Sequence, residues 1–579
     1  MPMKKLLTAF VLTALLLLPA ASAAGDEGAD ALNRLGLFSG SEAGYELDRT
    51  PTRAEALVML LKLTGQADEA LAGEWSHPFQ DAGWASSYIG YAYQNGLTAG
   101  VSDDMFGTSQ NATAQQYASF LLRALGYQEF DYENALTLLQ TSTPAVLPQG
   151  EGFTRGDLVD LSLAALAAPV ADGSGTLAAR LAGEGLFDYG DYQAARDSVG
   201  AQEAAQTTVL IYVTGSNLER TSGRATADIE EMLQAELTGN INIVLQTGGT
   251  KAWKNDWMTD GATQRFTIQN GTVQPASPVL EGVLMSQPET LANFLRWGVT
   301  SYPAQRYILV LWNHGGGTLR GYGHDEMNND KTLMLDELDQ AFTWADVDFA
   351  LVGFDACLMA TMSTSCMLKD HSSYLLASEE LEPVNGWYYT DWLTMLDQDP
   401  DMEVRPLAEA IADGYLTDAL KEDWLYATIS LIDLSRIDAV ADGWREVADQ
   451  LCQRLQEGRY ADVEQVLRQS KAYGQGTSYD QVDMTDFLTR AENAGLATTG
   501  ELRRAVSEAV VYRTGTPLMD RSNGLALYIP YEKYARYQEK VRKALLGSGF
   551  QEEDMAFWDE FYSLVKKNGP TKLVWPKNR

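Results

Sequence analysis

Two short segments of the sequence place reactive residue types directly after apolar runs. The run YILVLW (307–312) leads into His314 and three glycines, and the run FALVGF (349–354) leads into Asp355 and Cys357. A thiol of ordinary pKa is only slightly ionised at neutral pH, and a nearby imidazole favours the thiolate and can later protonate a leaving amine. These residue types therefore predict nucleophilic catalysis by a Cys/His dyad.

Backbone amides close to this dyad are candidates for an oxyanion hole. Attack on a carbonyl develops negative charge on its oxygen, which preorganised N–H groups stabilise. The glycines after His314 allow a substrate to approach the backbone without an intervening Cβ. The amide of Cys357 follows a predicted strand and begins a predicted helix. We therefore expect the amides of Gly315 and Cys357 to hold the oxyanion.

The placement of the dyad depends on which strands are neighbours. Reactive groups in open α/β sheets collect beyond the carboxyl ends of the strands. Successive strands are usually adjacent, which would put His314 and Cys357 on neighbouring loops. The alternative is a buried apolar cysteine and a structural histidine. We expect that structural role for Cys366 and Cys452, which lie in helical patterns, and we predict no metal or other cofactor.

The second part of the chain has the pattern of an α/β protein. Continuous apolar runs that alternate with helical stretches favour a mostly parallel sheet with helices on both faces. The segments 227–237 and 332–342 are predicted crossover helices. The predicted strands are 207–214, 241–246, 307–312, 349–354, 374–378, 427–432 and 525–529.

The first part of the chain contains a weak internal repeat. A Gly-Leu pair, a glycine turn, an aromatic residue and a threonine that opens an amphipathic helix recur in 36–65, 96–127 and, less clearly, 147–166. Repeats of this kind bury their apolar faces against one another. Each threonine is a predicted helix cap, with Glu55 or Gln116 completing a capping box.

The amino-terminal segment and the composition predict an exported protein. Lys4 and Lys5 precede an apolar run, and Ala21-Ser22-Ala23 suits a signal peptidase, so 1–24 is a predicted signal peptide. The three cysteines leave at least one thiol unpaired. A formal charge of −36 disfavours binding to nucleic acid or to anionic membranes.

The repeats resemble S-layer homology domains, on the stretches FQDAGWASSYIGYAYQNGLTAG (79–100) and TRAE (52–55). The resemblance implies a small, mainly helical module over 25–190 that binds cell-wall polysaccharide. It places Arg53 at a polymer-binding position, whereas the other copies read TAQQ and TRGD. The polar segment 191–206 is a predicted linker.

The rest of the chain resembles the clostripain family of cysteine peptidases, in the caspase-like clan. The matching stretches include LWNHGGG (311–317), GFDACLMA (353–360), ASEELEPVNGWYY (377–389) and NGLALYIP (523–530). The resemblance implies a catalytic core at 207–400, completed by 401–579. It also implies a His314/Cys357 dyad that cleaves protein or peptide substrates after Arg or Lys.

A pocket for a basic side chain needs a carboxylate, because a buried cation without a partner is costly. Asp355 lies two residues before Cys357 and therefore on the same side of an extended strand end. By resemblance this aspartate lines the primary pocket; the alternative is a helix cap. Ser378, Glu379 and Glu380 follow the next predicted strand and are further candidates for substrate binding.

Two further properties, internal cleavage and calcium binding, are expected from the resemblance alone. Internal cleavage between the histidine and the cysteine would use Arg320 or Lys331, and calcium would find acidic residues in 324–331. The sequence therefore predicts a secreted cysteine endopeptidase associated with the cell wall. The competing hypothesis is a wall-binding scaffold whose peptidase-like part is inert.

Overall fold

The structure is a computed structural model. It describes residues 23–570 apart from 41–43, most positions in 128–151, 169, 172–175, 199–204, 270, 278, 281, 475–478, 520, 533–536 and 538. The described residues form two compact units, one within 1–117, 148–163 and 181–200, the other within 118–147, 164–180 and 201–579. The predicted signal peptide lies outside the described residues except for its last two positions, which open α1.

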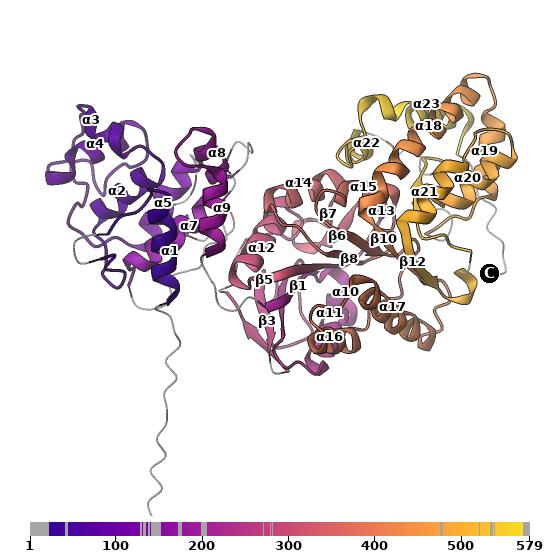
Figure 1. Cartoon of the computed structure of the whole chain (residues 1–579), viewed down its shortest axis with the longest axis horizontal. Coiled ribbons are helices and arrows are strands. Elements are labelled where there is room, and N and C mark those ends of the chain that lie inside the picture. Colours follow the sequence, from indigo (N-terminus) through magenta and orange to yellow (C-terminus); the bar gives the residue numbers. More distant parts are fainter. Residues whose placement is uncertain are drawn as a thin grey trace, which may run out of the picture. The chain divides into compact units, whose positions relative to one another are not determined.

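The smaller unit is built mainly from helices, and long irregular segments such as 95–113 connect some of them (Figure 1). Three of its helices begin directly after Thr52, Thr113 and Thr154, and each threonine forms the expected reciprocal pair with the residue three positions on. The capping boxes are therefore confirmed, and the third copy uses Asp157. The helices before residue 200 are α1 (Ala23–Arg34), α2 (Arg53–Leu63), α3 (Ala67–Ala72), α4 (Ser86–Gln94), α5 (Ala114–Ala124), α7 (Arg155–Leu166), α8 (Leu177–Gly183) and α9 (Tyr189–Ser198).

Arginine side chains join one repeat to the next in this unit. Arg53, at the start of α2, donates Nε–H to the carbonyl of Phe106 at 2.9 Å and lies over its ring at 4.9 Å. Arg155, at the start of α7, lies over the ring of Phe38 at 5.2 Å and donates Nε–H to the carbonyl of Tyr45 at 2.9 Å. These two arginines therefore each contribute a hydrogen bond and a cation–π contact to another copy of the repeat.

The predicted linker is partly wrong. Residues 191–198 belong to α9, in which Tyr192 and Ala195 are buried. The segment is polar, yet these two residues lie three positions apart and so share one helix face. Residues 199–204 lie outside the described part of the chain.

The larger unit contains a nine-stranded sheet in the order β12-β10-β9-β8-β5-β1-β2-β3-β4. The five central strands, from β9 to β2, are mutually parallel, and two antiparallel strands extend the sheet at each side. The strands are β1 (Ala205–Thr214), β2 (Ile241–Gly248), β3 (Gln264–Gln269), β4 (Thr272–Pro275), β5 (Ala304–Trp312), β8 (Leu351–Asp355), β9 (Tyr374–Ala377), β10 (Thr428–Asp433) and β12 (Val510–Gly515).

Helices cover both faces of this sheet, as the continuous apolar strands predicted (Figure 1). Along β1, Leu210 and Tyr212 join one buried cluster and Val209 and Ile211 join the other, because successive side chains point to opposite faces. The first cluster includes α12 (Pro288–Ser301), α14 (Leu335–Ala345), α15 (Met362–Leu368) and α18 (Ile437–Gln456); the second includes α11 (Arg224–Gln234), α16 (Tyr389–Gln398) and α17 (Val404–Lys421).

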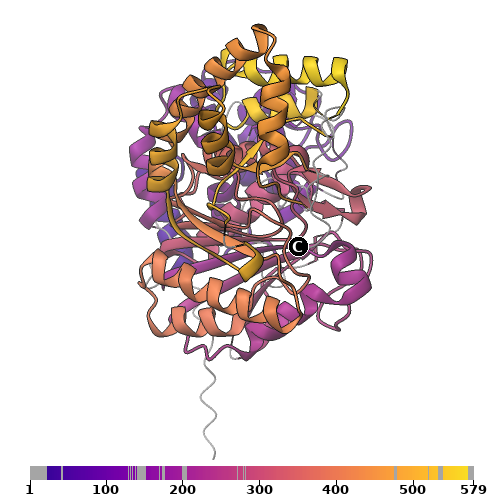
Figure 2. The same cartoon turned by 90° about the vertical axis from the view of Figure 1, so that its right-hand side faces the viewer.

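Residues after 400 complete the same fold. They supply β10 and β12 to the sheet, and their later helices lie on one side of it, orange to yellow in Figure 2. These are α19 (Tyr460–Gln469), α20 (Met484–Asn493), α21 (Gly500–Ala509), α22 (Glu539–Leu546) and α23 (Ala556–Asn568). None of the helices that the structure describes is long and apolar enough to cross a lipid bilayer.

One predicted strand exists but does not belong to the main sheet, so that part of the prediction is wrong. The segment 525–529 does contain a strand, β13 (Ala526–Tyr528), but it pairs with β11 (Gln481–Asp483) in a separate two-stranded sheet. A short apolar run indicates a buried strand and does not identify its neighbour.

Candidate active site

The strands that precede the predicted dyad are neighbours. β5 and β8 pair in parallel, and their last residues, Trp312 and Asp355, lie opposite each other. The next amide, that of Asn313, donates to the carbonyl of Asp355 at 3.2 Å. The expected adjacency is confirmed, so the loops that carry His314 and Cys357 leave the sheet side by side.

These two loops are in direct contact through their backbones. A Cβ added to Gly315 would lie 2.0 Å from the carbonyl oxygen of Cys357 and 3.1 Å from its nitrogen. No side chain fits in that space, so glycine is required by packing as well as by any need to leave amides accessible. The contact brings together the two amides predicted to bind an oxyanion.

His314 is a neutral imidazole at physiological pH. Burial, and then the neighbouring ring of His324 with its centroid 4.8 Å away, lower the pKa of His314 to about 4. Its Nε2 is hydrogen-bonded to Oδ1 of Asn217 at 3.0 Å. Asn217 lies in α10 (Ser216–Ser222), directly after β1. Asn217 was not predicted from the sequence, although it follows β1, the other neighbour of β5 in the sheet.

Asn313 ties three loops together behind the histidine. Its Nδ2 donates to the carbonyl of Thr214 and to Oγ of Ser216, the latter at 2.9 Å, and its Oδ1 accepts from the amide of His324 at 2.7 Å. Ser216 has a φ of +53°, which is uncommon for a residue other than glycine. This network fixes the position from which His314 projects.

Cys357 lies in a turn and not at a helix start, so that prediction is wrong. Helix α15 begins at Met362, and Thr361 caps it by accepting from the amide of Thr364. Leu358, directly after the cysteine, has a φ of +67°, a strained conformation that costs about 1–3 kcal/mol. Its amide donates to the carbonyl of Glu380 at 3.1 Å. This hydrogen bond to the loop that contains Glu380 fixes the turn that carries the thiol.

The thiol of Cys357 lies in an acidic environment. Its Sγ accepts a hydrogen bond from the backbone N–H of Glu382 at 3.2 Å. Burial, followed by the charges of Glu382 and Glu380, raises the pKa of Cys357 to about 12. Because His314 is neutral, it supplies no charge to oppose this effect. The thiol of Cys357 and the imidazole of His314 are therefore both neutral at physiological pH.

Asp355 is a buried carboxyl group at the end of β8, two residues before Cys357. It accepts from the amide of Trp387 at 3.2 Å and from the hydroxyl of Tyr389 at 2.9 Å. Burial is the main cause that raises its pKa to about 7. Since Thr361 caps α15, the alternative role of Asp355 as a helix cap is excluded. Gly386, with a φ of +63°, passes so close that its Cβ would lie 2.5 Å from the carboxylate.

The other predicted pocket residues are engaged with their own loop and the chain near residue 473. Ser378 is fully buried and shares a hydrogen bond with Thr428 at 3.0 Å. The carboxyl of Glu379 accepts from the hydroxyl of Tyr473 at 2.8 Å, and that of Glu380 accepts from the amide of Gly474 at 2.7 Å. The structure does not bring these groups to Asp355; the acid that meets it is Glu382.

The segment between the two loops forms a hairpin of β6 (Tyr322–Asp325) and β7 (Lys331–Leu333). Asp325 accepts from the amide and hydroxyl of Ser286 at 3.1 and 3.2 Å, so donors within the chain occupy its carboxylate. Arg320 lies over the ring of Tyr479, and Lys331 pairs with Glu337 at 3.0 Å. In the described residues, no group of three or more His, Cys, Asp or Glu could hold a metal ion.

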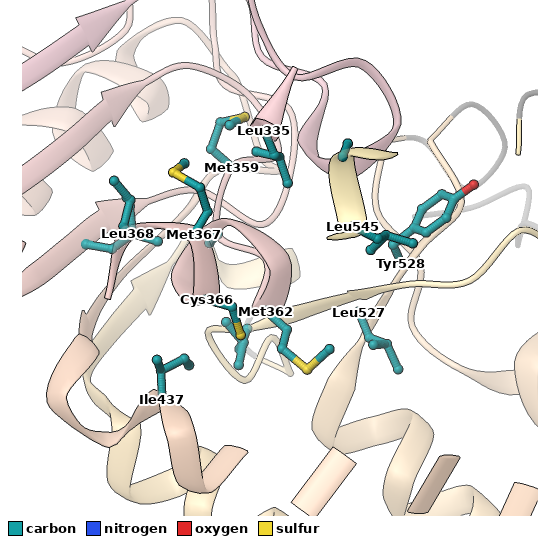
Figure 3. Packing of buried hydrophobic residues seen from close by; sticks show 14 of the residues in the cluster. Leu335, Met359, Met362, Cys366, Met367, Leu368, Ile437, Leu527, Tyr528 and Leu545 are labelled. Atoms are coloured by element: carbon teal, nitrogen blue, oxygen red, sulfur yellow. The ribbon is translucent and has the colours of Figure 1, made fainter. Parts of the chain in front are cut away.

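The second cysteine of this region is part of the core. Cys366, on α15, is 6% exposed and packs among apolar side chains of α15 and α18 (Figure 3). Burial raises its pKa to about 12. Cys452 is also buried, as expected for a structural residue. The chain therefore offers one cysteine at a strand end and two in helices that pack into the core.

A parallel central sheet with a histidine and a cysteine after neighbouring strands defines a caspase-like α/β protein. The chain belongs to the clostripain family, a family of cysteine peptidases whose model matches residues 211–575. The model of the S-layer homology domain matches residues 80–118, all but the last of which lie in the smaller unit.

Individual relatives are more distant. Clostripain of Hathewaya histolytica is 22% identical over 321 residues, which cover 45% of this chain and 60% of that protein. Cell surface glycoprotein 1 of Acetivibrio thermocellus is 34% identical over 87 residues, 14% of this chain and 4% of that protein. The chain thus spans less than two thirds of the length of these curated relatives.

Two solved structures are also similar. A secreted C11 cysteine protease from Bacteroides thetaiotaomicron, in complex with an irreversible peptide inhibitor, has a TM-score of 0.46 at 20% identity and covers 59% of this chain and 99% of its own. An inactive zymogen C11 protease from Parabacteroides distasonis has a TM-score of 0.43 at 20% identity, covering 61% of this chain and 99% of its own.

Proposed function

We propose that this chain is a cysteine endopeptidase of the bacterial cell surface that cleaves peptide bonds after Arg or Lys. The observation that carries the proposal is the contact between Gly315 and Cys357, because it joins a histidine loop to a cysteine turn at the carboxyl edge of the sheet. Family membership supports the same chemistry.

The proposed reaction proceeds through an acyl-enzyme. His314, neutral at physiological pH, accepts the proton of the Cys357 thiol as sulfur attacks the scissile carbonyl. The amides of Gly315 and Cys357 stabilise the oxyanion. The protonated imidazole then donates to the leaving amine, and water attacks the thioester with His314 again acting as base. Asn217 holds the imidazole through its Nε2.

Selection of a basic residue is assigned to Asp355. Its carboxyl group is buried at the end of the strand that leads to Cys357, where a cationic side chain of the substrate would find a partner that replaces water. Glu379 and Glu380 point toward Tyr473 and Gly474, so we assign them to fixing the loop that surrounds the pocket.

Location at the cell surface follows from the smaller unit. The S-layer homology match and the similarity to cell surface proteins support attachment to a wall polymer, and the predicted signal peptide supports export. Arg53 is only 6% exposed and packs on Phe106, so we propose that it shapes the repeat interface as well as any polymer site.

Substitution of the nucleophile tests the activity. The full chain, reduced, is expected to hydrolyse a peptide amide with Arg before the cut, and Cys357→Ala and His314→Ala to reduce the rate roughly a thousandfold or more. Cys366→Ala is the matched control, because it removes a buried cysteine of the core. Equal turnover by Cys357→Ala, with circular dichroism unchanged, would refute the proposal; no turnover by the wild type would favour the inert scaffold.

A further inference from the structure

Glu382 places a second carboxyl group against Asp355 at the nucleophile. The two carboxyls are in hydrogen-bonding contact, which requires that one of them carries a proton. The backbone of the same residue donates to Sγ of Cys357. Glu382 is 8% exposed, and among the described residues no N–H or O–H group donates to its Oε1. Glu382 is therefore a buried acid with one acceptor oxygen that no donor in the described part of the chain satisfies.

The groups around this carboxyl pair are acids and phenols. No basic side chain is among the described groups that perturb the pKa values of Asp355 and Glu382. Arg224 acts instead on Asp228 and donates to Asn385 at 2.7 Å. The ionisable groups that face the pair or lie next to it are Cys357, Asp228, Glu231, Glu380, Tyr389 and Tyr415.

Such a pair is costly to ionise without a cation. Burial raises the pKa of each carboxyl, and Asp355 raises that of Glu382 further, whereas the hydrogen bond with Glu382 lowers that of Asp355. A guanidinium between them would satisfy both, since it presents several N–H donors in one plane.

We propose that Glu382 is a second specificity-determining residue, and that the Asp355–Glu382 pair exchanges a shared proton for the cationic side chain of the substrate. The proposal rests on the proposed function and deepens it. The proton leaves to solvent as the cation enters, so the net charge of the buried site is the same before and after binding.

Proton release on ligand binding tests the exchange without any need for catalysis. Agmatine, a small guanidinium compound, is titrated into the full chain by calorimetry near pH 7 in buffers of different ionisation enthalpy. The wild type is expected to release about one proton per agmatine bound, because both carboxyls become ionised. Glu382→Gln is expected to release less than about a third of a proton.

Hydrolysis of two isosteric substrates tests specificity. Arginine and citrulline side chains have nearly the same shape, but only arginine is charged. Glu382→Gln is expected to lower the ratio of kcat/KM for the Arg substrate over the citrulline substrate by about 10- to 100-fold. Glu382→Asp should recover part of the ratio. Glu230→Gln, an exposed residue of α11, is the matched control and should behave as wild type.

The outcomes separate this inference from the proposed function. Hydrolysis by the wild type, with the substrate ratio and the proton release both unchanged in Glu382→Gln, overturns the inference and leaves the peptidase standing. If agmatine binding releases a proton in the wild type but not in Glu382→Gln, and neither substrate is hydrolysed, the cation site is supported and the proposed peptidase activity is refuted. Absence of proton release in the wild type also overturns the exchange.

Discussion

The state of the Cys357 thiol gives a prediction that separates two kinds of cysteine peptidase site. In one kind the free enzyme holds a thiolate–imidazolium pair, and its thiol reacts at low pH. Here the pKa of Cys357 is raised from 9.0 to about 12 and that of His314 is lowered to about 4. Between these values both groups are neutral. We therefore expect alkylation of Cys357 to increase with pH well above neutrality.

The size of the effect follows from the thiolate fraction. At about pH 8 an ordinary thiol is ionised in roughly one molecule in ten, whereas a thiol with a pKa of about 12 is ionised in roughly one in ten thousand. The loss is about a thousandfold. The more basic thiolate is intrinsically more nucleophilic by about 20-fold, so the net decrease in rate is about 50-fold.

The assay is alkylation of the reduced full chain with iodoacetamide across a range of pH, followed by peptide mapping. The guanidinium-unfolded chain supplies the reference rate for an ordinary cysteine at each pH. His314→Ala is the matched variant, and it should leave the pH profile of Cys357 unchanged because a neutral imidazole adds no charge. A rate for Cys357 that is constant between about pH 5 and 8, and is lost in His314→Ala, would refute the reasoning.

Two further predictions concern groups outside the dyad. Burial raises the pKa of Glu379 from 4.5 to about 8, so the folded state favours the protonated form; this stability is present below about pH 4.5 and lost as the pH rises through 8. The difference between the two pKa values corresponds to roughly 5 kcal/mol of unfolding free energy. Glu379→Gln keeps an acceptor for Tyr473 and should remove this pH-dependent loss of stability, measured by denaturant unfolding between about pH 4 and 9. Equal pH profiles for the wild type and the variant would contradict the prediction. Arg53→Ala should lower the unfolding free energy of the smaller unit by about 1–3 kcal/mol through loss of the Phe106 contact. If the variant keeps its stability but no longer sediments with purified cell wall, Arg53 would instead be assigned to polymer binding.

The central sheet could be predicted because its strands carry a strong local pattern. Strands buried on both faces are continuous apolar runs, and successive ones are usually neighbours, which was enough to place the loop of His314 next to the loop of Cys357. The outer strands lack that pattern. β4 is largely exposed and β12 is only half-buried, so neither contains an apolar run that distinguishes it from a loop.

The pocket could be predicted only in part, for a different reason. Asp355 lies on a strand, where a period of two fixes its side relative to Cys357. Glu379, Glu380 and Glu382 lie on an irregular loop, where no period applies. Their carboxyls reach Tyr473, Gly474 and Asp355 respectively, so three similar residues in four positions have three different partners. Only the loop conformation decides which of them meets the site.

The acidic surroundings of Cys357 oppose its reactivity and select its substrate by the same Coulomb interaction. A negative charge near the thiol disfavours thiolate, and a negative charge in the pocket favours a cation. Glu382 does both, because its backbone contacts Sγ and its carboxyl contacts Asp355. A substrate with a neutral side chain would leave the carboxyl pair with its shared proton. A cationic side chain would replace that proton, so both carboxylates would gain a charged partner while the net charge beside the thiol stays the same. Discrimination between the two should therefore appear in binding, with a higher KM for the citrulline substrate.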